Sequence, residues 1–180
     1  PLYGTVDVSV DWGDGNIESI NTTGNASHTY STAGQYTVNI TGQLTEFGDT
    51  VSYYVVNSEA LTAVTSWGTL GLQSLEEAFM SCSNLTSVPT TLPRTVTNIN
   101  WMFDSASSFN QNIGSWDTSA VTTMEGTFYG TTIFNGNVER WDTSSVTSMR
   151  SMFFNARAFN RDISVWNTSA VTNMLAMFSI

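Results

Sequence analysis

The chain has 180 residues, of which 41% are hydrophobic and only 11% are charged. The hydrophobic share is typical of a folded protein rather than a disordered one. Fifteen acidic residues stand against five arginines and no lysine, so the net charge is −10. At this charge, long-range repulsion excludes nucleic acid and anionic membrane surfaces as expected partners.

Residues 1–60 are predicted to form a small antiparallel β-sandwich. Valine alternates with polar residues from Val6 to Val10, which indicates a strand. Asp14-Gly15 is typical of a hairpin turn. Two further strands are predicted over residues 36–40 and 51–56, and no helical period appears in this part of the chain.

Asp11 and Asp14 are weak candidate ligands for calcium, because paired carboxylates beside glycines can hold this ion. The spacing and the terminal glutamate of an EF-hand are missing. We therefore favour the alternative in which Trp12 belongs to the core and the aspartates cap turns. His28, the only histidine, is expected to be a structural hydrogen-bonding residue. Apart from the weak calcium candidate, no cofactor is predicted.

Residues 61–180 repeat themselves every 24 or 25 residues. Six apolar positions recur in register, most clearly the tryptophans at Trp116, Trp141 and Trp166. The other five series begin at Val96, Ile99, Phe103, Phe109 and Ile113. A single repeat cannot bury its own apolar face, so neighbouring repeats must stack. This pattern predicts a solenoid of about four coils, the last one incomplete.

Within each coil we expect one short strand, at residues 110–116 and their copies, followed by a helical turn at residues 122–129. Asp117 begins an Asp-Thr-Ser triplet that is expected to supply turn and helix-capping residues. Glu125 and Arg150 lie one repeat apart and are expected to form a surface ion pair. An asparagine ladder is expected at Asn110, Asn135 and Asn160.

Two parts of the chain resemble known families. The segment from Val10 to Gly15, taken with residues 28–38, is similar to the PKD-like β-sandwich pattern. The segment from Phe159 to Met174 closely resembles the BspA-like repeat of bacterial surface proteins, which also occurs in mycoplasma-type lipoproteins. The resemblance implies a mainly β fold with short helices, in which the sandwich precedes a right-handed leucine-rich-repeat-like solenoid. It also implies a secreted or cell-surface protein associated with adhesion, with no catalytic residues to carry over.

Candidate binding residues lie where the predicted strands differ between coils while the core positions do not. A stack that holds its core constant and varies one face is typical of a recognition surface. The expected partner is a protein or glycan on another cell or in the matrix. The candidate positions are Gln111, Ser115, Gly136, Glu139, Arg140, Arg161, Ser164 and Val165.

Several alternatives remain open. Solvent-facing positions can drift without any ligand, and the repeats can serve as a spacer, a stalk or a self-assembling fibre subunit. An enzyme is not expected, because lysine is absent and the only histidine and the only cysteine, Cys82, fall in different modules. No stretch is apolar enough to span a membrane. The chain starts at Pro1 and stops within the repeat pattern at Ile180, so we expect both ends to be cut.

Overall fold

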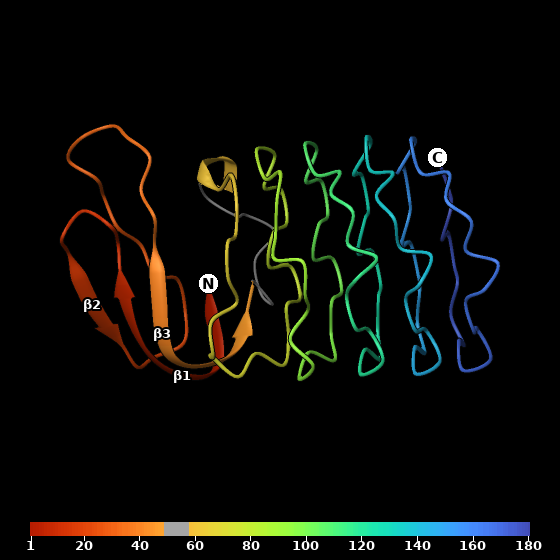
Figure 1. Cartoon of the computed structure of the whole chain (residues 1–180), viewed down its shortest axis with the longest axis horizontal. Helices are drawn as coiled ribbons and strands as arrows, with labels where there is room; N and C mark the ends of the chain where they lie inside the picture. Colours follow the sequence, from red (N-terminus) through yellow and green to blue (C-terminus); the bar gives the residue numbers. More distant parts are fainter. Residues whose placement is uncertain (49–57) are drawn as a thin grey trace.

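The computed structural model describes residues 1–48 and 58–180. Its regular elements are the strands β1 (Leu2–Asp11), β2 (Ile17–Ile20) and β3 (Asn39–Phe47), and a short 3-10 helix, η1 (Ser58–Ala60). The strands form one antiparallel sheet in the order β2-β1-β3. Figure 1 shows this sheet at one end of the molecule, with the rest of the chain following it as successive layers.

The central strand β1 forms where valine alternates with polar residues. Val6, Val8 and Val10 are buried on one face of the sheet, as the alternation predicts. Val8 pairs with Ile20 of β2 on one side, and Val10 pairs with Ile40 of β3 on the other. The predicted strand over residues 36–40 is displaced, since β3 begins at Asn39, and β2 was not predicted.

The predicted β-sandwich is wrong. The described residues contain a single three-stranded sheet, and the first repeat layer is hydrogen-bonded to its edge strand β3. The amide of Leu44 donates to the carbonyl of Leu70 at 2.9 Å, and that of Phe47 donates to Ser74 at 3.1 Å. The end of β3 is therefore hydrogen-bonded to the first layer, as a neighbouring strand would be. The predicted strand over residues 51–56 lies outside the described residues.

The predicted leucine-rich-repeat-like solenoid, with a strand and a helix in each coil, is also wrong. From residue 61 to residue 180 the described chain contains no β-strand and no helix. Successive layers are joined instead by isolated parallel bridges between residues 24 or 25 positions apart. These bridges run from Ser74 through Asn98, Thr123 and Ser148 to Asn173. Residues 110–116, predicted as a strand, form an irregular segment with a turn.

Hydrogen bonds between layers explain why no helix forms at residues 122–129. Alternate amides there donate to the next layer, such as those of Met124, Gly126 and Phe128 to the carbonyls 24 residues later, at 2.8–3.0 Å. An α-helix would direct the same amides to its own preceding turn. The backbone also takes positive φ angles that interrupt a helix, 55° at Gly126 and 65° at Gly130. The helical spacing of Val121, Met124 and Phe128 therefore reflects a series of tight turns.

Stacked aromatic rings fill the interior of the layers. Phe103, Phe128 and Phe153 lie face to face, with ring centroids 5.7 and 5.5 Å apart and nearly parallel planes. Face-to-face rings exclude water over a large area at each layer boundary. The buried apolar residues form one cluster from Leu2 in β1 to Met177 in the last layer, so the sheet and the layers share a core.

The polar repeats give mixed outcomes. The asparagine ladder is confirmed, since the amides of Asn135 and Asn160 donate to the side-chain oxygens of the asparagine one layer earlier, at 2.7 and 3.0 Å. Asp117 accepts hydrogen bonds from Ser119 and so stabilises a turn, although no helix follows for it to cap. The predicted ion pair between Glu125 and Arg150 is wrong. The Glu125 carboxylate accepts a hydrogen bond from Ser148 at 2.5 Å instead.

Candidate functional site

The predicted binding positions come together along one edge of the stack. We call segments 110–116, 135–141 and 160–166 the variable rim. Asparagine side chains hold these segments side by side, including Asn112, which accepts a hydrogen bond from the amide of Asn137 at 2.9 Å. Of the eight candidates, Ser115, Arg140, Ser164 and Val165 are exposed, and Gln111, Glu139 and Arg161 are half-buried. Gly136 is buried, so the expectation that it is exposed is wrong.

Three of the candidates bond to the preceding layer. The Gln111 amide both accepts from the Val88 N–H at 2.7 Å and donates to the Val88 carbonyl at 2.9 Å. Ser115 donates to the carbonyl of Thr90 at 2.6 Å, and Arg161 donates through Nε to the carbonyl of Asn135 at 2.8 Å. These polar groups hold the layers together, so fewer of their hydrogen-bond donors and acceptors remain for a ligand.

Gly136 differs from its counterparts in other layers for a steric reason. A Cβ atom at this position would lie 2.1 Å from the carbonyl oxygen of Gln111. The close approach of two backbones therefore requires glycine here. The variation at this position reflects packing between layers and is not evidence for recognition.

A row of buried tryptophans supports the rim from below. The Trp116 and Trp141 rings are stacked with centroids 6.1 Å apart, and Trp141 and Trp166 follow at 6.4 Å. Each indole N–H donates to a carbonyl of the preceding layer, as Trp141 does to Ile113 at 3.0 Å. Arg140 and Val165 thus project from a rigid platform, and Val165 is 74% exposed.

Aspartates beside the rim keep their negative charge to unusually low pH. Hydrogen bonds from Ser119 lower the pKa of Asp117, and those from Ser144 lower the pKa of Asp142. Arg94 lies 3.2 Å from the Asp117 carboxylate and compensates part of the charge. The edge that carries the rim therefore holds these aspartates together with two arginines of the rim itself, the exposed Arg140 and the half-buried Arg161.

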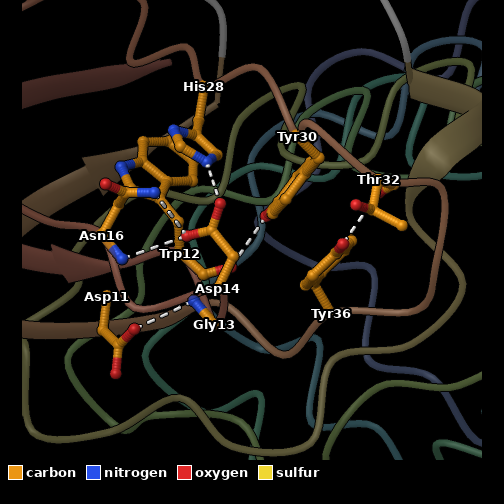
Figure 2. Close-up of polar contacts among 9 residues, drawn as sticks. All are labelled: Asp11, Trp12, Gly13, Asp14, Asn16, His28, Tyr30, Thr32 and Tyr36. Carbon is orange, nitrogen blue, oxygen red and sulfur yellow. Dashed lines mark hydrogen bonds and ion pairs between the residues drawn. The ribbon is translucent and has the colours of Figure 1, made fainter.

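The candidate calcium ligands belong to a separate hydrogen-bonded cluster, drawn in Figure 2. Asp14 uses one carboxylate oxygen to contact Nε2 of His28 at 2.7 Å, and the other accepts from the amide of Asn16 at 3.1 Å. Asp11 accepts from the amide of Gly13 at 2.9 Å. In the described parts of the chain, no three acidic, histidine or cysteine residues lie together as a metal site. The two aspartates stabilise turns.

Aromatic contacts complete this cluster. His28 stacks on Trp12 with ring centroids 5.1 Å apart and meets the edge of Tyr30 at 4.7 Å. Tyr30 stacks on Tyr36 and donates a hydrogen bond to the carbonyl of Trp12 at 2.9 Å. The hydrogen bond from His28 is the main cause that lowers the pKa of Asp14, while desolvation raises the pKa of Tyr30. The predicted structural role of His28 agrees with these contacts.

The only cysteine, Cys82, is buried. Burial raises the pKa of the Cys82 thiol to about 11, which keeps it protonated and unreactive at neutral pH.

Trp67 lies outside the positions predicted from the sequence, yet it borders a hollow at the start of the rim. The signal that could have revealed it is its spacing, since Trp67 lies 49 residues, or two repeats, before Trp116. No helix within the described ranges has the length and apolar character to cross a membrane.

Comparison with known protein families gives a match over more than half of the chain. A family model described as "Mycoplasma protein of unknown function, DUF285" matches residues 73–180, which include the whole variable rim. No curated protein and no solved structure matches the chain.

Proposed function

We propose that this chain, which belongs to the DUF285 family of Mycoplasma proteins of unknown function, is a binding module of a secreted or cell-surface protein. Its partner is a protein or glycan on another cell or in the matrix, recognised through the variable rim. The resemblance of segment 159–174 to BspA-like surface repeats supports the same role. No catalytic step is part of this proposal.

One observation carries the proposal. Equivalent rim positions hold Ser115, Arg140 and Val165, which are polar, cationic and aliphatic, while the tryptophan beside each of them is the same and is buried. Arg140 and Val165 are exposed, and they lie one layer apart on a platform held by side-chain hydrogen bonds. A rigid scaffold with unlike exposed groups in neighbouring layers suits recognition, because its backbone loses little conformational freedom on binding.

The test is binding of the chain to a panel of immobilised matrix proteins and glycans. We expect Arg140→Glu and Val165→Asp each to weaken the interaction at least tenfold. Arg150→Glu is the matched control, since Arg150 is an exposed arginine outside the rim, and it should bind like the wild type. Binding that survives both rim substitutions unchanged contradicts this placement.

The second candidate function is that of a spacer or stalk subunit that self-associates. It is favoured by the bridges that continue from Glu46 in β3 through every layer to Asn173, because such a stack is stiff along its length. A sedimentation coefficient that rises with protein concentration supports this alternative. A full-length protein that stays monomeric over the same range counts against it.

A further inference from the structure

A hollow of about 520 Å³ opens on the surface just before the variable rim. Segments 65–68 and 89–93, which lie in consecutive layers, line it. The hollow is shallow and open to solvent, so a ligand bound there would keep part of its surface exposed. The hollow adjoins the rim directly, because Ser115 donates a hydrogen bond to the carbonyl of Thr90 in its wall.

The hollow exists because the tryptophan series is interrupted here. The layer that precedes Trp116 carries Thr91 and Leu92 where later layers carry tryptophan. Trp67, from the layer before that one, leans forward and donates its indole N–H to the carbonyl of Thr91 at 2.6 Å. The indoles of Trp116, Trp141 and Trp166 donate to the preceding layer, so Trp67 has the opposite direction. Its ring makes an edge contact with Trp116 at a centroid distance of 6.4 Å and lies 6.1 Å from the Phe79 ring, and the residue remains half-buried.

The lining of the hollow is neutral and rich in hydroxyl groups. Within the described part of the chain, the side-chain hydroxyls of Thr65, Thr90 and Thr91 have no hydrogen-bond partner, and all three residues are exposed. No lining residue is charged. The nearest arginine, Arg94, already pairs with Asp117 at 3.2 Å. The site thus offers an aromatic surface together with hydroxyl donors and acceptors, and no counter-ion for a charged ligand.

We propose that this hollow binds one neutral sugar unit of a glycan, an inference that rests on the proposed binding function of the rim. A sugar ring presents an apolar C–H face that packs on an indole, and its hydroxyls both donate and accept hydrogen bonds. Sialylated and sulfated sugars find no cation in the lining, and the net charge of −10 repels them. An extended proline-rich peptide usually requires a groove lined by several aromatic rings, whereas this hollow contains one.

The experiment measures binding of the whole chain to an array of neutral, sialylated and sulfated oligosaccharides. We expect the wild type to bind neutral members and Thr91→Glu to bind them at least tenfold more weakly, because a carboxylate then occupies the hollow. Ser107→Glu is the matched control, since it adds the same charge at an exposed hydroxyl residue outside the hollow and should not alter binding. Trp67→Ala should abolish binding, with circular dichroism to verify that the variant is folded.

The outcomes separate this inference from the proposed function. Neutral glycan binding that is lost with Thr91→Glu and kept with Ser107→Glu supports the sugar site. Binding confined to anionic glycans, binding to peptides alone, or Thr91→Glu binding within threefold of the wild type overturns it. A chain that binds no saccharide but binds a protein in an Arg140-dependent way also overturns the sugar site, while the role of the rim stands.

Discussion

The N-terminal sheet and the stacked layers satisfy their backbones in different ways. In the sheet, Ser9 pairs with Ser19 on one side and Thr41 on the other, so hydrogen bonds follow the length of each strand. In the layers, one bridging residue per layer is flanked by tight turns whose alternate amides reach the next layer. The comparison shows that long strands are not needed for regular stacking. The regularity of the layers is specified by side-chain rows instead.

The largest expected difference between the two regions concerns their cores. Phe128 is fully buried between two stacked rings, so Phe128→Ala should lower the free energy of unfolding by about 3–5 kcal/mol. Val8→Ala in β1 should lower it by about 1–2 kcal/mol, because each buried methyl group is worth roughly 0.8 kcal/mol. Denaturant unfolding followed by circular dichroism measures both values.

The same measurement tests whether the regions share one core. Both variants should retain a single transition at a lower denaturant midpoint, since the buried cluster is continuous from β1 to the last layer. Phe178→Ala is the control, because this ring belongs to the same row but is 56% exposed, and its cost should be much smaller. Two separate transitions in Phe128→Ala would show that the sheet folds independently of the layers.

A smaller effect is expected from the asparagine ladder, which the sheet lacks. Asn135→Ala removes the acceptor for the amide of Asn160 and should destabilise the chain by about 1 kcal/mol. Asn39→Ala, on the exposed edge of β3, should change stability by less than about 0.5 kcal/mol. Equal effects at the two positions would mean that the ladder adds nothing to the layers beyond ordinary surface polarity.

The smallest effects concern two aspartates with opposite pKa shifts. The hydrogen bond from His28 lowers the pKa of Asp14, so its stabilising contribution is present above the ordinary value of 3.8 and is lost as the pH falls through the lowered pKa. Burial raises the pKa of Asp104, so this carboxyl destabilises the fold as the pH rises from 3.8 through the raised value. At neutral pH, Asp14→Asn should therefore lower the Tm and Asp104→Asn should raise it.

Thermal melts from acid to neutral pH measure this difference in sign. At a pH below both folded pKa values the aspartates are protonated, so each variant should approach the wild-type Tm. A Tm that falls in Asp104→Asn at neutral pH would show that the Asp104 carboxylate stabilises the folded chain despite its burial.

The sequence predicts some features of the fold well because side-chain identity alone carries them. The tryptophan and phenylalanine rows, the asparagine ladder and the strand around Val8 all follow from periodic spacing. The prediction of a helical turn at residues 122–129 was wrong, because tight turns closed by hydrogen bonds between residues three apart give the same spacing of Val121 and Met124 as a helix does. The sandwich was wrong because alternation in β1 shows that one face is buried, but not what covers it.

The candidate site was less predictable for a similar reason. Variation between repeats identified Arg140 and Val165, which are exposed, but it also selected Gly136, where backbone contact excludes a side chain. Gln111 and Arg161 vary too, although they bond to the preceding layer. The hollow beside Trp67 depends on a residue missing from a series, and its indole turns toward the next layer for reasons that only packing reveals.

The hydrogen bonds between layers also give the stack a net dipole along its axis. The amides of Ile99, Trp101, Phe103 and Ser105 all donate toward the next layer, while that of Thr97 donates back. The same arrangement recurs in later layers, so peptide dipoles add along the axis, as they do in a helix. In an association of two such stacks end to end, donors facing acceptors would be favoured. Joining like ends across a two-fold axis would oppose most N–H groups to N–H groups.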